Sequence, residues 1–197
     1  MMKSMLVVMG LLVTALISFQ IYSTMATTKS ETQPYQILKT EKEYEIRYYP
    51  TATVATVAMA ARTYKELSAT GFRKLASFIF GGNQANKNIA MTTPVHMDIN
   101  DSLSSMSFVM PAEYTKGNLP QPNDSAIKIT AKLEEYVAAI RFDGYANDAN
   151  IKMYTTKLKN ALKEKGIEYY GNFRFLGYNA PYRFWSRRNE IIVSVRW

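Results

Sequence analysis

Residues 44–59, YEIRYYPTATVATVAM, and residues 64–80, YKELSATGFRKLASFIF, decide the fold class, because the spacing of apolar residues changes between them. In the first stretch apolar and polar residues alternate up to Pro50, and a run rich in β-branched residues follows. This period of two predicts two strands, which we expect to form a hairpin. In the second stretch the apolar residues recur at helical spacing until Gly81 and Gly82, which predicts one helix.

The same order of elements recurs along the rest of the chain. A strand pair follows the helix, a loop over residues 112–125 divides the chain, and a second hairpin, helix and strand pair come after it. The predicted strands cover residues 89–99, 106–110, 127–133, 135–142, 173–178 and 190–197, and the second helix is capped by Asp148 and ended by Gly166. Neither half can bury the faces of its strands alone. We therefore expect an α+β domain in which two repeated ββαββ halves, an internal repeat, share one sheet system with two helices packed on it.

The first 26 residues differ in kind from the rest of the chain. Lys3 provides a short basic start, and residues 5–19 form an uncharged apolar run of the length found in signal peptides. Small residues precede a cleavage position after Ala26. These features predict that residues 1–26 are a signal peptide.

The alternative for this region is an uncleaved membrane anchor over residues 5–21, which is just long enough to span a bilayer. In both cases residues 27–34 form a polar tether and residues 35–197 form an exported domain. If the source is bacterial, the domain is periplasmic or secreted, and it contacts a membrane only if the anchor is retained.

Composition excludes several classes of site. The 197 residues predict one domain, and the absence of cysteine excludes disulfides, thiolate catalysis and iron–sulfur or zinc–thiolate sites. The net charge is +8, and Lys3 is the one charged residue among the first 26, so the excess charge belongs to the folded domain. In an exported protein this charge meets lipid head groups, anionic polymers or an anionic small ligand rather than nucleic acid.

The chain carries no motif of an enzyme. It lacks the nucleophile elbow, the phosphate-binding loop, the dinucleotide fingerprint and the zinc-protease motif. Glu134 and Glu135 are adjacent carboxylates, but neighbours on a strand point to opposite faces and cannot act together as acid and base. We therefore expect a protein that is not an enzyme.

His96 is the one side chain that could ligate iron or titrate near neutral pH. Its place on the predicted strand is opposite Val95, Met97 and Ile99, which predicts a histidine exposed at the surface or at the rim of a pocket. A role as ligand of a haem iron is the alternative. Met91 and Met97 could be soft axial ligands, but in a chain with 11 methionines a role in the core is favoured.

The segment over residues 178–190, YNAPYRFWSRRNE, combines aromatic rings with fixed cations. Tyr178, Tyr182 and Arg183 could bind a planar ligand that has carboxylate arms. The alternative is structural, with Arg188 paired to Glu190 while the rings cover the end of the sheet.

The first helix has more apolar residues than one core face requires. Phe78 and Phe80 lie off the stripe that contains Leu67 and Leu75, so we expect part of this helix to line a ligand pocket. Gly71 lowers the helix propensity, which predicts that another part of the chain approaches the backbone there.

Six short motifs together resemble the SOUL/haem-binding protein family, and the likeness covers residues 35–197 in order. They are IAMTTPV at 89–95, FVMP at 108–111, LPQPND at 119–124, FDGY at 142–145, Gly177-Tyr178 and RRNEI at 187–191. The resemblance implies a distorted β-barrel of two repeated halves flanked by two helices, similar to the effector-binding domains of some bacterial regulators.

The resemblance also implies a function. Members of the family bind haem b or other tetrapyrroles, in a hydrophobic groove over the first helix with basic residues at the propionates. By position, the helix contacts fall on Phe72 and Ala76, and the basic position falls on Arg183. This implies an exported, non-enzymatic binder of a small planar apolar ligand, with no nucleic acid as partner. The alternative is a binding module for another apolar small ligand or for a protein partner.

Overall fold

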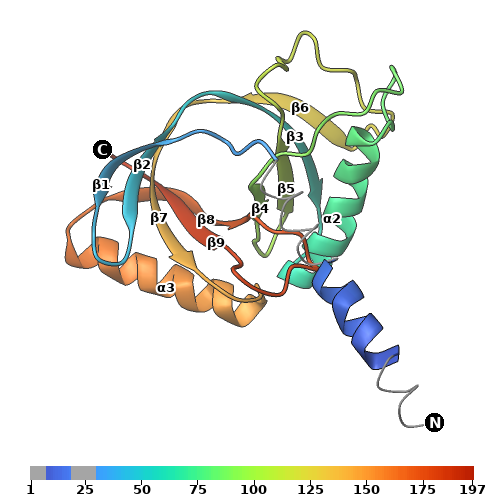
Figure 1. The fold of residues 1–197 in the computed structure, drawn as a ribbon. Helices are drawn as coiled ribbons and strands as arrows, with labels where there is room; N and C mark the ends of the chain where they lie inside the picture. The colour runs from blue at the N-terminus through green and yellow to red at the C-terminus, as the bar shows by residue number, and fades with distance from the viewer. Residues whose placement is uncertain (1–7, 19–29) are drawn as a thin grey trace.

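The structure is a computed structural model that describes residues 8–18 and 30–197 (Figure 1). Residues 8–18 form a helix whose side chains are exposed. Among the described residues, no helix is long and apolar enough to cross a membrane. The expected cleavage position after Ala26 and residues 27–29 of the expected tether lie outside the described residues.

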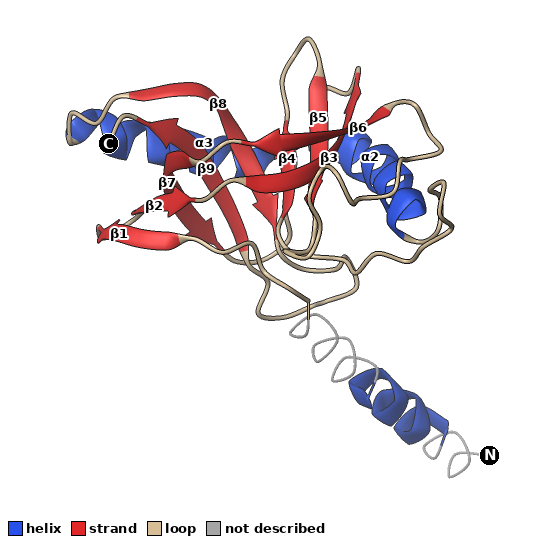
Figure 2. Cartoon of the chain, turned by 90° about the horizontal axis from the view of Figure 1, so that it is seen from above, coloured by secondary structure: helices blue, strands red, loops and turns tan. Residues whose placement is uncertain are grey.

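Within residues 30–197, nine strands form one antiparallel sheet that curls into a half-barrel, and helices α2 and α3 cover its outer face (Figures 1 and 2). The elements are β1 Gln36–Thr40, β2 Glu45–Tyr49, β3 Ala52–Met59, α2 Tyr64–Ile79, β4 Val95–Asp98, β5 Ser104–Val109, β6 Ile127–Lys132, β7 Glu135–Phe142, α3 Asp148–Glu164, β8 Tyr169–Gly177 and β9 Asn189–Val195. The expected α+β fold, a distorted barrel flanked by two helices, is confirmed.

The strand order, β1-β2-β7-β9-β8-β4-β5-β3-β6, shows how the two halves combine. In the first half β5 lies between β3 and β4, and in the second half β9 lies between β7 and β8. The first strand of each half crosses to the other half, because β2 pairs with β7 and β6 pairs with β3. β4 and β8 pair at the centre. Each half therefore contributes an edge region to the other, and neither half has a complete sheet alone.

Neither of the two expected hairpins forms, so this expectation is wrong. Two residues separate β2 from β3, and two residues separate β6 from β7, but the strands of each pair lie in different parts of the sheet. Alternation of apolar residues identifies a strand without identifying the strand beside it, since the same alternation suits either neighbour. β1 was missed because all five of its side chains are exposed, so it carries no apolar alternation.

Helix α2 begins and ends where its sequence signals predict. The Thr63 side chain accepts a hydrogen bond from Glu66 N at 3.2 Å, and the helix ends at Ile79. A Cβ atom added to Gly71 would lie 3.2 Å from Met106 Cβ on β5. The expected close approach at Gly71 is confirmed, and it lets the helix pack tightly on the sheet.

Helix α3 has a different cap from the expected one. The Asn147 side chain accepts from Asn150 N at 2.8 Å and caps the helix, so the expectation of Asp148 as cap is wrong. Asp148 Oδ1 instead accepts from Tyr64 N, at the start of α2, at 2.6 Å. This bond places a carboxylate at the positive end of the α2 dipole and joins the first turns of the two helices.

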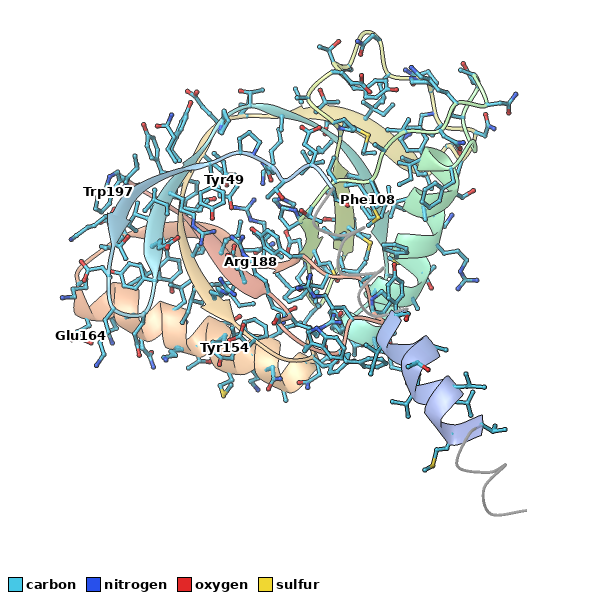
Figure 3. All side chains as sticks on the ribbon, in the orientation of Figure 1. Tyr49, Phe108, Tyr154, Glu164, Arg188 and Trp197 are labelled. Carbon is cyan, nitrogen blue, oxygen red and sulfur yellow. The ribbon has the colours of Figure 1, made fainter. Side chains whose placement is uncertain are left out.

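A chain of aromatic rings crosses the core between the sheet and the helices. Tyr64 on α2 lies 5.3 Å from Phe175, which lies 6.3 Å from Phe142, and Phe142 stacks on Tyr154 of α3 at 4.3 Å between ring centroids. Figure 3 shows Tyr154 between α3 and the sheet. The core therefore ties both helices to the same central strands.

The phenylalanines near the end of α2 do not form the expected pocket. Phe78 is buried in the core, so the expectation that it lines a pocket is wrong, whereas Phe80 is mostly exposed beyond the end of the helix. Because Phe78 and Ile79 both point inward, the last turn of α2 buries a wider face than the stripe through Leu67 and Leu75 predicts.

The inner face of the half-barrel holds a second, smaller apolar cluster. It consists of Tyr49, Val137, Ala139, Leu176, Tyr178 and Ile192. Residues 31–35, which we call the N-terminal strap, cross the open side of the half-barrel from β4 toward β1 (Figure 1). Gln33 N donates to Thr93 O at 2.7 Å, and the Tyr35 ring lies 5.3 Å from the Tyr49 ring. The strap thus covers part of the inner face.

Candidate functional site

The centre of the inner face is a buried carboxylate with two guanidinium partners. Glu190, near the start of β9, accepts from Arg47 Nη1 and Nη2 of β2 at 2.7 and 3.2 Å. Arg188 donates to the same carboxylate from Nε and Nη2 at 2.9 and 2.7 Å, and the Tyr178 hydroxyl donates at 2.9 Å. Figure 3 shows Arg188 inside the ring of strands. The carboxylate therefore joins β2 to both ends of the loop between β8 and β9.

Electrostatics keep this network ionised. Burial alone would raise the pKa of Glu190, but the hydrogen bonds from Arg47 and the charges of Arg47 and Arg188 hold the pKa below its ordinary value. Burial raises the pKa of Tyr178, so its hydroxyl stays a donor. The Arg188 guanidinium lies 3.9 Å from the Tyr178 ring centroid, and Arg47 lies 4.3 Å from that of Tyr35 in the strap. These cation–π contacts give the two guanidinium groups aromatic partners in place of the water that they lose in the folded protein.

A second polar cluster lies further along the inner face. Glu135 of β7 accepts from Arg174 of β8 at 3.0 and 2.6 Å, forms an ion pair with Lys132 at 2.6 Å, and accepts from the Ser194 hydroxyl at 2.9 Å. Burial opposes ionisation of Glu135, but the two cations lower its pKa to about 2. Glu135 is therefore ionised at neutral pH and links β7 to Arg174 of β8.

His96 lies beside this second cluster and lines a small cavity of about 110 Å³ with Lys132 and Arg174. The expectation that it is exposed at the surface is wrong, whereas its expected place at a pocket agrees with this cavity. His96 is buried, and its Nε2 donates to Gln33 Oε1 of the strap at 2.8 Å. β4 is a central strand whose outer face packs on the core and whose inner face is covered by the strap, so both faces of β4 are buried. Burial, with the charges of Lys132 and Arg174, holds the His96 pKa well below its ordinary value. The ring is neutral at neutral pH, and its Nε2 is engaged by Gln33.

The loop between β8 and β9, residues 178–188, carries the predicted aromatic and basic residues. Tyr182 and Trp185 are about half exposed, and Arg183 Nε donates to Trp185 O at 3.1 Å. Arg187 is buried beneath the loop, where its Nη1 donates to the carbonyls of Ala180 and Arg183 at 2.9 and 2.7 Å. An internal guanidinium therefore holds the loop in one shape.

The structural interpretation of this segment holds in part. The expected pair between Arg188 and Glu190 is present, and Tyr178 belongs to the same buried network. Tyr182 and Trp185, by contrast, keep about half of their surface in solvent. The loop thus has a structural root and an exposed aromatic tip.

The predicted residues of α2 lie in the middle of the helix. Phe72 and Ala76 are half-buried, and the Phe72 ring packs edge-on against Phe108 at 5.4 Å. The loop root approaches the other end of α2, where the Arg187 charge acts on the Tyr64 hydroxyl. Phe72 lies about 12 Å along the helix from Tyr64. The predicted residues therefore form two groups along one side of the domain, and Tyr178 belongs to neither.

Two clefts lie near these features. One, of about 300 Å³, separates α3 from the sheet, with Met97, Phe175 and Ile191 at its floor and Lys152 and Asn172 at its rim. The other, of about 330 Å³, opens beside Arg47, Arg188 and Glu190. Phe72 and Ala76 line neither of these clefts.

Sequence reasoning missed Arg47, Gln33 and the cluster around Glu135. The signal for Arg47 was present, since it alternates with Ile46 and Tyr48 in a strand and so had to face away from the main core. Gln33 offered no signal, because its role depends on the strap crossing the sheet.

Comparison with known proteins identifies the family. The family described as SOUL heme-binding protein matches residues 30–194. Heme-binding protein 2 of Mus musculus is 28% identical over 156 residues, which are 75% of this chain and 76% of that protein. Heme-binding protein 1 of Sus scrofa is 28% identical over 172 residues, which are 82% of this chain and 90% of that protein.

Solved structures show the same fold at much lower identity. The C-terminal domain of EcmrR is 10% identical with a TM-score of 0.59, covering 82% of this chain and 98% of that one. A structure described as a hydrolase from Listeria innocua is 7% identical with a TM-score of 0.56, covering 81% and 94%. At these identities the likeness concerns the fold alone. The family match over nearly the whole described domain shows that the chain belongs to the SOUL heme-binding protein family.

Proposed function

We propose that this chain is a non-enzymatic binder of haem b or another tetrapyrrole, held in a hydrophobic groove over α2 beside the loop between β8 and β9. The observation that carries the proposal is the tip of this loop, where half-exposed rings stand beside Arg183 on a backbone held by Arg187. Membership in the family and the names of the relatives support the ligand class. No pair of carboxylates or nucleophile and base stands at the loop tip, which supports binding rather than catalysis.

The residues of the chain fit the macrocycle and its carboxylates better than its iron. Phe72 and Ala76 offer apolar surface, and Tyr182 offers a half-exposed ring that can lie against a macrocycle. Arg183 uses one donor on Trp185 O, which leaves other guanidinium donors for a propionate. His96 is buried and bonded to Gln33, so iron ligation by it would require breaking that bond.

Haem titration of the full chain, followed by its Soret band, tests the proposal. Arg183→Ala should weaken binding by about 1 to 3 kcal/mol if the charged hydrogen bond forms out of bulk water. Arg196→Ala is the matched control, because Arg196 is an exposed cation paired with Glu168 beyond the other end of β9. Binding no stronger than to an unrelated basic protein, or equal losses in both variants, would overturn the proposal.

Two further variants locate the groove. Phe72→Asp should weaken binding more than Arg183→Ala does, because it puts a carboxylate where the macrocycle lies. Ala76→Glu tests the same face without removing the contact between Phe72 and Phe108. His96→Ala should leave the affinity within a few-fold and the Soret position unchanged. A large loss of haem affinity in His96→Ala would show that His96 ligates the iron.

A second candidate function is a binding module for another apolar small ligand or for a protein partner. The cleft between α3 and the sheet favours a small ligand, because its floor is apolar and its volume is near the lower limit for ligand pockets. Mass spectrometry of protein purified from its native compartment separates the candidates. A bound porphyrin supports the first, and a smaller apolar molecule or a peptide supports the second.

We also propose that the domain acts outside the cytoplasm. The basic start and the uncharged apolar run over residues 5–21 support export. Amino-terminal sequencing of the mature protein tests cleavage after Ala26, and recovery of Met1 or Met2 from membranes would indicate the anchor.

A further inference from the structure

The exposed tip of the loop between β8 and β9 concentrates aromatic side chains on one small surface. Tyr182, Phe184 and Trp185 are 46%, 58% and 50% exposed. Tyr145, at 49% exposed, extends this surface, because its ring lies 4.6 Å from the guanidinium of Arg187 in the root of the loop. Exposed apolar patches of this kind mark surfaces that interact with partners or membranes.

The loop holds these rings in place through its own backbone. Arg187 donates to the carbonyls of Ala180 and Arg183, and Arg188 N donates to Asn179 Oδ1 at 2.5 Å. Ser186 has a φ of 50°, a left-handed backbone conformation that is uncommon for residues other than glycine. The rings are therefore presented by a braced turn, and ordering them on a partner costs little additional entropy.

The chemistry of the tip fits the interface of a lipid bilayer. Tyrosine and tryptophan collect where head groups meet acyl chains, because one end of each ring system is polar and the other apolar. Arg183 lies between Tyr182 and Phe184 in the sequence and donates to Trp185 O, and a guanidinium beside these rings can bind the phosphates of anionic head groups. The net charge of +8 also favours binding of the protein to an anionic lipid surface.

The chain enters the domain close to the root of the aromatic loop. Residues 5–21 contain no charged side chain, and residues 22–30 span at most about 30 Å when fully extended. The chain enters the domain at the strap, where Thr93 N donates to Glu31 O at 2.8 Å. Two residues after Thr93, Val95 pairs with Gly177, the last residue before the loop. If the apolar segment is retained as the anchor, its point of attachment to the domain therefore lies beside the root of the aromatic loop.

We propose that the loop between β8 and β9 docks on the surface of an anionic lipid bilayer and inserts the rings of Tyr182, Phe184 and Trp185 into its interface. The proposal does not depend on haem binding. It predicts one orientation of the domain, with the loop toward the lipid and the opposite end of β9 toward water.

The chain contains two tryptophans, which makes this orientation measurable. Trp185 lies in the loop before β9 and Trp197 lies beyond its other end, more than about 20 Å away at the rise of a strand. Figure 3 shows Trp197 at the end of the molecule far from α2. The two rings are 50% and 52% exposed, so they form a matched pair.

The test uses the full chain with vesicles of phosphatidylcholine and phosphatidylglycerol that carry brominated acyl chains. Trp197→Phe leaves Trp185 as the one fluorophore, and Trp185→Phe leaves Trp197. The emission of Trp185 should shift to shorter wavelength and be quenched severalfold more than that of Trp197. Phe184→Ser in the Trp197→Phe background should reduce this quenching, with thermal unfolding measured to confirm that the variant is folded.

Three results would overturn the proposal. Equal quenching of the two tryptophans would show that the domain has no preferred face, and quenching of Trp197 alone would show the opposite orientation. Quenching of neither ring would show that the domain stays away from the lipid. None of these readouts involves haem, so a failure here is separate from a failure of haem titration.

Discussion

Replacing Glu190 by glutamine tests the network that fixes both ends of the loop. The carboxylate is fully buried and accepts five hydrogen bonds, two from Arg47, two from Arg188 and one from Tyr178. Glutamine keeps the shape of the side chain, but it removes the negative charge and turns one acceptor into a donor that faces other donors. The buried guanidinium of Arg47 and the partly buried one of Arg188 are then left without their shared counter-charge.

The size of the effect follows from this geometry. Removing one partner of a buried ion pair costs about 3 to 5 kcal/mol. Glu45, 2.7 Å from Arg47 Nε, still compensates one of the two cations, so the loss should lie near the lower limit, about 3 kcal/mol. For a domain of this length that corresponds to a fall in Tm of roughly 6 to 12 °C. It is also a large share of a typical folding free energy.

Urea denaturation and thermal unfolding measure the loss. Glu168→Gln is the matched control, because Glu168 pairs with Arg196 at 3.1 Å but both side chains are mostly exposed. Its stability should stay close to that of the wild type, since exposed ion pairs contribute little. If Glu190→Gln and Glu168→Gln have the same stability, the network does not hold the root of the loop. Quenching of Trp185 by acrylamide should also increase in Glu190→Gln, because the loop loses its fixed ends.

Three further outcomes are expected. The folded-state pKa of His96 lies well below its unfolded value, so the unfolded chain takes up the proton first as the pH falls. At pH values below about 6.5, the free energy of unfolding should therefore decrease by up to about 1.4 kcal/mol per pH unit. His96→Gln should flatten that slope in urea denaturation between about pH 6.5 and 5, and unchanged slopes would contradict the burial argument. Glu135, with its pKa lowered to about 2, stabilises the fold fully above about pH 4.5 and loses that contribution as the pH falls toward 2. Glu135→Gln should therefore remove part of the acid transition measured by circular dichroism, and an identical transition would speak against this ion pair. Gly82→Ala would place a Cβ atom 2.5 Å from Ser77 O and should cost about 1 to 3 kcal/mol of folding free energy. Gly117→Ala is the control, because the nearest atom to its added Cβ lies at 3.8 Å, and it should change stability by less than about 0.5 kcal/mol. Equal Tm values for the two variants in calorimetry would refute the clash.

Local signals in the sequence predicted the elements well. The helix over residues 64–80 was predicted to within one residue of α2, because its apolar spacing and the glycines that follow it are local signals. The close approach at Gly71 was predicted for the same reason, since a glycine in a helix is unfavourable unless something needs the space. β1 had no such signal because its side chains are all exposed.

The candidate site could be predicted only in part. The exposed rings of Tyr182 and Trp185 and the pair between Arg188 and Glu190 lie within one segment of chain, so the sequence was enough to suggest both. The burial of His96 could not be predicted, because alternation gives the face of a strand but not what covers that face. Here the cover is Gln33, which is 63 residues away in the sequence.

The sequence by itself determined both helices, the strands other than β1, the order of the two halves and the family, because these depend on patterns within short stretches of chain. Only the tertiary structure decided which strands are neighbours, that β2 and β6 exchange places between the halves, and that the strap closes the inner face. It also decided that Arg47, from the first half, shares the charge of Glu190 near the end of the second. The physical reason is that a buried charge is stable only when a partner lies beside it. For Arg47 the buried partner, Glu190, is 143 residues away in the sequence, so its position is set by the pairing of the whole sheet.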